Sequence, residues 1–504
     1  MKTLATLLTL LYFVAPSAAQ NVDLGTDAQR EAGRLMYNAK CSHCHGARGA
    51  GDGAATAFLR PAPRDFTTGT FKFRTTENGE LPTDEDIRRS IRQGMPYTGM
   101  PPWPQLSEQE VDNLMYYIKT FSDFFSGPFA EVTALDMPSP PSITDESIVR
   151  GREVFLENSC IDCHGNLGRG DGPSGPTLTD QWDIPIRAAD LTKRWTFRGG
   201  STRSDIYRTF TTGLDGSPMP AFDIQPIEDQ WALVNYVHSL SRDEADYSTY
   251  ATSVFTTAAI DPSAGADAFS AAPEAFFAMV GQVIEPGRSF FPGVNGLAVR
   301  AMHNADHIGI MLQWNDMSAD TDGINGPGLE VPIWPNDTDT TQAFSDAVAI
   351  QFPSGDGSGG GLPYLLFGDV SNSVDLWFAD LSTPRADHYV GNGSGNLTAS
   401  GMDYETSASY EDGQWTVIIK RDRTLDGQIT FEDAAFAPVL FSVWDGFSRE
   451  RGNRRGLTSW TYLYLEPAET ESPLGPMAMY GLITLLLGLG ATTLIRRKYS
   501  NVSA

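Results

Sequence analysis

The chain has 504 residues and a formal net charge of -27, from 36 basic and 63 acidic residues. At roughly 150 residues per domain, this length predicts about three domains, each able to bury its own core. So acidic a chain argues against a nucleic-acid partner, because phosphate binding needs basic patches. An acidic surface suits a basic protein partner, although solubility alone explains it as well.

The N-terminal residues have the pattern of a secretory signal. Lys2 precedes an apolar run at 4–14, and small residues follow at 17–19. We predict cleavage after Ala19, which makes residues 1–19 a signal peptide. A retained anchor is the alternative, but the apolar run is too short to span a bilayer.

The four cysteines of the chain form two C-x-x-C-H motifs, at 41–45 and 160–164. Two thiols three positions apart can add to the two vinyl groups of one haem, and the adjacent histidine then faces the iron. Disulfides or a shared zinc site would not explain why a histidine follows each pair. The motifs therefore predict two covalent c haems, attached at Cys41 and Cys44 and at Cys160 and Cys163, with His45 and His164 as iron ligands.

A distal methionine ligand is expected downstream of each motif, because a thioether stabilises ferrous iron. Met95 and Met100 are the candidates in the first half. The first cysteines of the two motifs are 119 positions apart (160 - 41), as are Met100 and Met219 (219 - 100), whereas Met95 maps onto Leu214. We therefore predict Met100 and Met219 as the axial ligands and Met95 as a packing residue.

Other paired features accompany the motifs. They are Gly46 and Gly165, the Gly-Asp-Gly segments 51–53 and 170–172, Phe73-Arg74 and Phe197-Arg198, and Met100-Pro101 and Met219-Pro220. On these residues the region 25–245 resembles two tandem class I cytochrome c domains, which we place at 25–124 and 144–245.

The cytochrome resemblance implies all-α domains in which a first helix packs against a last one. The expected first helices are 28–38 and 148–158, and the expected last helices are 108–120 and 227–240, whose apolar residues have helical spacing. Tyr117 and Tyr236 are interpreted as packing residues. Arg74 and Arg198 either pair with haem propionates or are solvated. With histidine and methionine both bound, the iron has no open position, which favours electron transfer over enzyme chemistry.

The composition and the residue pattern of the sequence change after about residue 254. Gly, Asn and Asp turns separate short alternating runs, which predicts an all-β sandwich over residues 255–467. The strand candidates are 307–314, 414–421, 439–444 and 459–465. In the last of these, aromatic residues Trp460, Tyr462 and Tyr464 share one face, for which core packing is the expected role.

The third region contains several short stretches in an order typical of one known family. They are 299–304, 314–316, 346–353, 368–369, 374–377, 415–421 and 441–460, the last with Trp444-Asp445-Gly446 and Glu450-Arg451-Gly452. On these stretches the region resembles the haem-binding domain of the ethylbenzene dehydrogenase gamma subunit and its dimethylsulfide dehydrogenase, chlorate reductase and nitrite oxidoreductase relatives. This resemblance implies one b-type haem bound by a methionine and a lysine, and service to a molybdopterin enzyme.

The residues of that haem b site do not all carry over. The family pattern often has methionine just before the Gly368-Asp369 pair, where this chain reads Tyr-Leu-Leu-Phe at 364–367. The remaining candidates are Lys420 on one side and Met302, His303 or Met311 on the other. Each of them also fits an ordinary structural role, so the sequence leaves open whether the domain binds haem b or is a haem-free docking module.

A C-terminal stretch completes the predicted topology. Residues 473–495 contain no charge and are followed by Arg496, Arg497 and Lys498. We predict a transmembrane helix at 474–495, with a buried core helix as the weaker alternative. The basic cluster stays cytoplasmic under the positive-inside rule, which places the bulk of the chain in the periplasm on the inner membrane.

The parts together predict an electron-transfer protein and not an enzyme. Its expected partners are redox proteins: a molybdopterin oxidoreductase on one side and a soluble cytochrome or terminal oxidase on the other. A dihaem peroxidase is the competing enzyme hypothesis, and it would require an iron without a methionine ligand.

Overall fold

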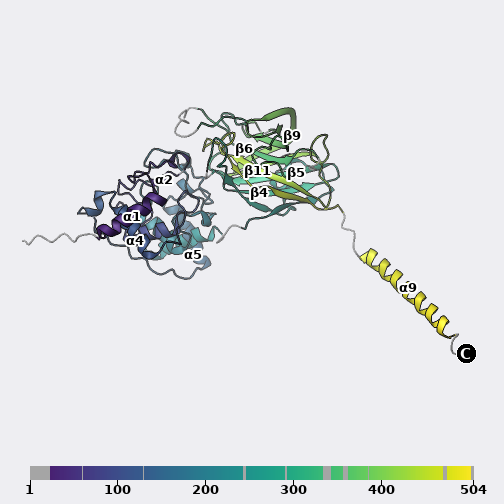
Figure 1. Cartoon of the computed structure of the whole chain (residues 1–504), viewed down its shortest axis with the longest axis horizontal. Coiled ribbons are helices and arrows are strands. Elements are labelled where there is room, and N and C mark those ends of the chain that lie inside the picture. Colours follow the sequence, from purple (N-terminus) through teal and green to yellow (C-terminus); the bar gives the residue numbers. More distant parts are fainter. Residues whose placement is uncertain are drawn as a thin grey trace, which may run out of the picture.

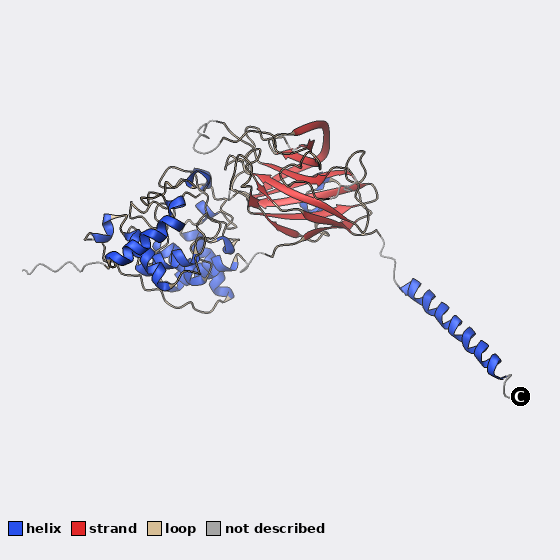
Figure 2. Ribbon diagram, viewed as in Figure 1, coloured by secondary structure: helices blue, strands red, loops and turns tan. Residues whose placement is uncertain are grey.

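A computed structural model describes residues 23–500 except 60, 129, 242–245, 290–291, 333–341, 356–360, 384 and 469–473. Two helical domains form the N-terminal part, a β-domain follows, and one long helix comes last (Figure 1). Figure 2 shows the same division, with helices gathered in the first part and strands in the second. The predicted fold class is confirmed, while the predicted signal peptide lies outside the described residues.

The two helical domains share one order of elements. The first contains α1 (Asp27–Lys40), α2 (Ser42–His45), η1 (Thr56–Phe58), α3 (Asp84–Gln93), α4 (Glu108–Lys119) and η2 (Asp123–Ser126). The second contains α5 (Asp145–Glu157), α6 (Ile161–His164), η3 (Gly175–Thr177), η4 (Arg194–Thr196), α7 (Arg203–Thr212) and α8 (Ile227–Ser239). Capping boxes at Thr26, Thr83, Ser107, Thr144 and Thr202 begin five of these helices, because each hydroxyl satisfies a free backbone N–H. The predicted first and last helices are all present.

In each domain the first helix crosses the last one at a glycine. A Cβ at Gly33 would lie 2.0 Å from the carbonyl oxygen of Asn113 on α4, and one at Gly151 would lie 2.0 Å from that of Ala232 on α8. Any side chain at either glycine would push the helices apart. The crossing therefore fixes both helix pairs at backbone contact.

Tyrosines pack beside these crossings. Tyr117 meets Tyr37 edge-on with ring centroids 5.4 Å apart, and Tyr236 meets Phe155 in the same way at 5.4 Å. The packing role expected for Tyr117 and Tyr236 is confirmed.

The β-domain is a sandwich that closes on itself. Its elements are β1 (Tyr250–Phe255), η5 (Pro262–Ala264), η6 (Ala266–Phe269), β2 (Ala275–Ala278), β3 (Val280–Gly281), β4 (Gly296–His303), β5 (His307–Asn315), β6 (Ala347–Pro353), β7 (Val374–Asp380), β8 (Arg385–Gly391), β9 (Leu397–Glu411), β10 (Gln414–Asp422), β11 (Phe436–Trp444), β12 (Gly456–Leu457) and β13 (Thr461–Leu465). The strands run in the order β13-β1-β4-β5-β10-β9-β8-β7-β6-β11, and β11 pairs with β13 to complete the ring.

Two long strands join the halves of the sandwich. β9 pairs with β8 through its first half and with β10 through its second, while β11 pairs with β13 and then with β6. The interior is filled by apolar side chains of both halves, including Trp314, Trp377 and Phe441. The domain therefore has few free strand edges.

The expected position of the aromatic face on β13 is wrong. Leu463 and Leu465 are fully buried, whereas Tyr462 is 41% exposed and Tyr464 is half-buried. Alternation assigns the residues of a strand to two faces. Because both faces of this strand carry large apolar side chains, the sequence did not show which face points inward.

The chain ends in α9 (Leu474–Ser500). Its segment Met477–Lys498 is long and apolar enough to cross a membrane, and none of that segment is buried against the rest of the described structure. The alternative of a buried core helix is therefore wrong.

Candidate functional site

Each C-x-x-C-H motif forms a one-turn helix directly after a longer one. The N–H groups of Cys44 and His45 both donate to the carbonyl of Cys41, and the second motif repeats the bond from His164 to Cys160. This turn places the cysteines and the histidine on one side of the backbone. None of the four cysteines forms a disulfide.

The two motif histidines are held in one tautomer. Nδ1 of His45 donates to the carbonyl oxygen of Arg64 at 3.0 Å, and Nδ1 of His164 donates to that of Ala189 at 3.0 Å. Because Nδ1 carries the proton, Nε2 has a free lone pair for a metal. Burial lowers the pKa of both imidazoles, which keeps them neutral and able to ligate.

Burial raises the pKa of the Cys41 and Cys160 thiols to about 11. A catalytic or redox-active thiol has the opposite shift, because it must ionise near neutral pH. The environment therefore does not favour a thiol-exchange site.

The structure shows why the Gly-Asp-Gly segments occur after both motifs. Gly46 and Gly165 adopt positive φ angles of 77° and 75°, and a Cβ on either would fall within 2 Å of the carboxylate of Asp52 or Asp171. The N–H of Gly51 donates to the carbonyl of His45 at 2.9 Å, as its counterpart in the second domain does to His164. These loops hold the histidine backbone in place.

The predicted axial methionines lie on matching loops. The N–H of Met95 donates to the carbonyl of Met100 at 2.9 Å, and the N–H of Leu214 donates to that of Met219 at 3.0 Å. A hydroxyl side chain two residues before each methionine accepts its N–H, at Thr98 and at the equivalent serine. The loop backbone thus follows the 119-residue repeat that separated Met100 from Met95.

Both motifs and both methionine loops border one continuous cavity of about 1500 Å³. Its walls include Cys41, Cys44, His45 and Met100 from the first domain and Cys160, Cys163, His164 and Met219 from the second. The structure therefore brings together every residue predicted to hold a c haem. Met95 borders the same cavity.

Arg64, Lys72 and Arg198 border this cavity, and none of them forms an ion pair with a carboxylate among the residues that the structure describes. The NH1 group of Arg64 is buried and unbonded, and its guanidinium lies 5.5 Å from the ring centroid of Trp182 in the second domain. Burial, together with the neighbouring Arg64 and Arg198, lowers the pKa of Lys72 to about 8. Arg64 and Lys72 are half-buried and Arg198 is exposed. Cations clustered at a cavity attract an anion, so Arg64, Lys72 and Arg198 fit the carboxylates of haem propionates.

Arg74 has a different role from either one expected. It is fully buried and joins the two helical domains, through a 2.9 Å hydrogen bond to the carbonyl of Thr212 and a 3.0 Å ion pair with Asp215. Neither a propionate nor solvent contact is left for its guanidinium. The expectation for Arg74 is therefore wrong.

The cytochrome c family matches the chain twice, over residues 30–122 and 148–241. The two helical domains are cytochrome c domains. Covalent haem c is therefore the cofactor that the paired motifs imply, and the donor sets just described fit it.

Several known respiratory proteins are similar to part of the chain. A protein of Haloferax mediterranei, named as a candidate respiratory nitrate reductase haem subunit, is 28% identical over 185 residues, which is 36% of this chain and 59% of that protein. The CcoP subunit of a cbb3-type cytochrome c oxidase from Azospirillum is 26% identical over 222 residues, 41% of this chain and 61% of that subunit. The chain thus spans about six-tenths of the length of these relatives.

Among solved structures, a chain of the reducing HAO-like protein complex of Kuenenia stuttgartiensis is 40% identical. The match covers 42% of this chain and 96% of that chain, with a TM-score of 0.40.

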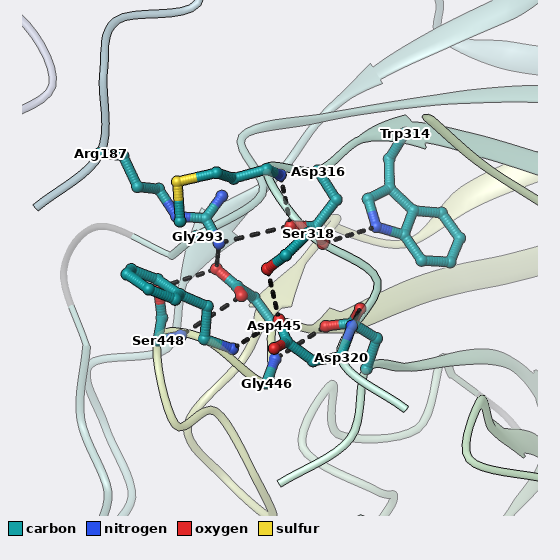
Figure 3. A network of polar contacts seen from close by, with 12 residues as sticks. Arg187, Gly293, Trp314, Asp316, Ser318, Asp320, Asp445, Gly446 and Ser448 are labelled. Atoms are coloured by element: carbon teal, nitrogen blue, oxygen red, sulfur yellow. Dashed lines mark hydrogen bonds and ion pairs between the residues drawn. The ribbon is translucent and has the colours of Figure 1, made fainter. Parts of the chain in front are cut away.

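The β-domain borders the haem cavity through a buried polar network (Figure 3). Arg187, from a loop of the second cytochrome c domain, contacts the carboxylates of Asp316 and Asp445, the former at 3.4 Å. Asp316 directly follows β5 and Asp445 directly follows β11, at one end of the sandwich. The Arg187 guanidinium therefore links the second cytochrome c domain to the ends of β5 and β11.

Further carboxylates surround this ion pair. Asp346 accepts from the N–H of Gly446 at 2.8 Å and from the indole of Trp415 at 2.9 Å, and Glu450 accepts from the N–H of Gly293 at 2.8 Å. Burial raises the pKa of Asp316 to about 7 and that of Glu450 to about 8, with Asp445 adding to both. The pKa of Asp346 rises for the same reason.

Two further contacts strengthen this boundary. Arg169 donates to the carbonyl of Asp412 at 2.6 Å, and Lys193 donates to the side chain of Asn295 at 3.2 Å. The second cytochrome c domain is thus tied to the β-domain at several separate points.

Two of the haem b candidates lie in one row across the sheet, whereas His303, next to Met302 on β4, points to the opposite face. Met302 on β4 and Lys420 on β10 both pair with Gly309 on the strand between them, so their side chains share a face. The space above Gly309 is filled, because a Cβ there would lie 2.6 Å from Ile260 and 3.1 Å from Phe269.

Each candidate also has a structural partner. Lys420 forms a 2.8 Å ion pair with Glu405. His303 is fully buried and its Nδ1 lies 2.9 Å from the hydroxyl of Ser253. Met311, the further candidate, is buried in the same small apolar cluster against which Met302 packs.

Sequence reasoning missed the role of the Arg187 network. The segments around Asp316, Asp346 and Asp445 supported the family resemblance, but no function was assigned to them. A usable signal was present, since each aspartate adjoins a strongly apolar strand, where a buried carboxylate needs a partner.

Proposed function

We propose that the chain is a single-pass, membrane-anchored cytochrome that transfers electrons through two c haems, with its domains on the periplasmic side of the inner membrane. The observation that carries the proposal is the shared cavity, on whose walls both C-x-x-C-H motifs and both methionine loops lie. The shared lining leads us to expect that the two haems exchange electrons with each other.

The residues of each site have defined roles in this proposal. The four motif cysteines would hold the haems covalently, Nε2 of His45 and of His164 would ligate the irons, and Met100 and Met219 would each supply a thioether sulfur as a further ligand. A bound haem supplies a one-electron iron couple. With both axial positions filled by protein, the chain positions and insulates the haems and offers substrate no place on the metal.

The ligand assignment is tested with Met100→Ala and Met219→Ala in purified protein. Each change should abolish the methionine-ligated spectrum of one haem and leave the other haem unchanged. Unchanged spectra in both variants would favour the dihaem peroxidase hypothesis, because methionine would then not be a ligand.

For the partner, we propose a respiratory oxidoreductase, more narrowly one of the molybdopterin class. The support is the relative named as a candidate nitrate reductase haem subunit, together with the resemblance of the β-domain to gamma subunits. The similarity to an oxidase subunit makes a terminal oxidase or soluble cytochrome the proposed partner on the other side. Affinity purification from solubilised membranes tests this, and an oxidase without any molybdopterin subunit would contradict the narrower proposal.

For the β-domain, we propose a haem-free docking module in preference to a haem b carrier. Ile260 and Phe269 fill the space between Met302 and Lys420, and Lys420 is already paired with Glu405. Haem b binding would require η5 and η6 to move away.

Pyridine haemochrome analysis decides between the two roles. Two c haems and no b haem per chain support the docking module. One b haem that is lost in Lys420→Ala or Met302→Ala would establish the gamma-like role.

The proposed topology has its own test. Alkaline carbonate should leave the full chain in the membrane fraction, and protease added to spheroplasts should degrade the cytochrome c and β-domains. Protection from external protease would place the domains in the cytoplasm and contradict the proposal.

A further inference from the structure

The outer face of three adjacent strands of the β-domain is uncharged and rich in aromatic residues. The pairing of β1 with β13 and of β13 with β11 sets which residues point outward together. These outward positions are Tyr250, Thr252 and Val254 on β1, Tyr462 and Tyr464 on β13, and Phe436 and Pro438 on β11. None is charged, although the chain carries a net charge of -27.

Four of these residues form what we call the aromatic patch: Tyr250, Phe436, Tyr462 and Tyr464. Phe436 lies at its centre, with ring centroids 6.0 Å from Tyr250, 6.2 Å from Tyr462 and 4.8 Å from Tyr464. Tyr250, Phe436 and Tyr462 are 48%, 57% and 41% exposed. Large aromatic side chains grouped on a surface in this way indicate an interaction site.

The patch is placed close to where the chain leaves the β-domain for its anchor. Tyr464 is the last residue but one of β13, and α9 begins at Leu474. Residues 466–473 can span at most about 30 Å when fully extended. A membrane that α9 crosses therefore lies within reach of the aromatic patch.

We propose that the aromatic patch rests in the interfacial layer of the bilayer that α9 spans, so that the sandwich lies on its side against the membrane. Tyrosine suits this layer because its ring is apolar and its hydroxyl meets water and headgroups. The face without charges avoids the cost of desolvating ions at the lipid surface. Contact with zwitterionic lipid suffices, since the patch offers no cation to anionic headgroups.

The consequence is a fixed orientation for the haems. β1 and β13 run parallel, and the strand ends that hold Arg187 lie at the opposite end of the sandwich from Phe436. With the patch on the bilayer, the cytochrome c domains lie beside the membrane surface and do not project away from it. Membrane-bound partners could then reach the haem cavity without bending the chain.

The test uses the full holoprotein, one copy per phosphatidylcholine nanodisc. Nitroxide labels are attached to Phe436→Cys and to Tyr462→Cys, one at a time. With both haems attached, the native cysteines are thioether-linked and take no label. Collision rates with oxygen, which concentrates in lipid, and with an aqueous nickel chelate report the depth of each label.

The matched control is Met402→Cys, which replaces a side chain of 44% exposure on β9. β9 lies on the far side of the ring of strands from β13. We expect higher oxygen and lower nickel collision rates at 436 and 462 than at 402. Equal rates at the three positions in incorporated protein overturn the patch proposal alone.

The proposal rests on the proposed anchoring, and the two fail differently. Full chain that does not enter nanodiscs overturns both. Labels at 436 and 462 that are shielded from both oxygen and nickel overturn the lipid contact and indicate a protein occupant. A second set of nanodiscs contains anionic lipid. Labels that reach the lipid in those discs but not in phosphatidylcholine discs would contradict contact with zwitterionic lipid.

Discussion

The network around Arg187 makes a sharp prediction about how the haem-bearing and β-domains stay together. Arg187→Met removes the cation that contacts Asp316 and Asp445, both fully buried. Removing one partner of a buried ion pair costs about 3–5 kcal/mol. Arg187 is 24% exposed, so we expect the lower end, about 3 kcal/mol, which is roughly two orders of magnitude in an opening equilibrium.

The predicted loss depends on pH in a definite direction. Burial raises the pKa of Asp316 from 3.8 to about 7 and that of Glu450 from 4.5 to about 8. The folded network thus binds more protons than the unfolded chain between about pH 4 and pH 8, so its stability falls as pH rises through this window. Arg187 lowers both pKa values, and its removal therefore destabilises the network more at pH 8 than at pH 5.

Hydrogen exchange read by mass spectrometry measures this locally, which avoids assuming two-state unfolding in a multidomain chain. The reporter amides are those of Met317 and Ser448, which donate to Asp316 at 2.7 Å and to Asp445 at 3.3 Å. At pH 8 they should exchange about a hundredfold faster in Arg187→Met, after correction for intrinsic rates.

The controls separate charge from packing in that experiment. Arg187→Lys keeps the cation and should retain most of the protection. The pair Arg187→Met with Asp445→Asn removes both charges and should recover part of it. An equal loss at pH 5 and pH 8, or none at pH 8, would refute the electrostatic account of the interface.

Three further predictions concern the cytochrome c domains. Gly151→Ala should lower the free energy of unfolding by about 1–3 kcal/mol or more, because the new methyl group would lie 2.0 Å from a carbonyl oxygen. Thermal melts measure this loss, and Gly328→Ala, where nothing lies within 4 Å of the added methyl group, should show none. Met100→Leu should lower the midpoint potential of the first haem in spectroelectrochemical titration, since thioether ligation raises it, while Met95→Leu should not, and the reverse result would reassign the ligand. Lys72→Met should lower the midpoint potential of a haem, since a nearby cation favours the reduced iron. An unchanged potential would contradict the placement of Lys72 beside the haem propionates.

The cytochrome c domains were largely predictable because their chemistry is local in sequence. The C-x-x-C-H spacing is set by one haem, and the 119-residue repeat transferred each feature from one domain to the other. The same repeat indicated Met100 in preference to Met95 as the ligand. The two methionine loops form equivalent internal hydrogen bonds. Strand positions in the β-domain were predictable for a similar reason, since alternation and turn residues are local signals.

The contacts between domains were not predictable from such signals. Arg74 reads like a haem-binding arginine, yet its partners Thr212 and Asp215 are more than 130 positions away in the chain. Tyr462 lies on a strand whose two faces are both apolar, so the inward face could be chosen only with β1 and β11 in place. Long-range packing decides these cases, and one sequence carries no direct record of it.

The difference between the two haem loops shows how the β-domain was accommodated. The histidine of the first domain bonds the carbonyl 19 residues later, at Arg64, whereas that of the second bonds one 25 residues later, at Ala189. The longer loop has six additional residues (25 - 19), and it carries Arg187 to the strand ends of the sandwich. What repeats between the domains serves each haem separately, and what does not repeat attaches the pair to the β-domain. Replacing residues 178–187 by the shorter loop of the first domain should therefore leave both haems attached and remove the Arg187 contact, while the contacts of Arg169 and Lys193 with the β-domain stay. Hydrogen exchange at Met317 and Ser448 should then speed up as it does in Arg187→Met.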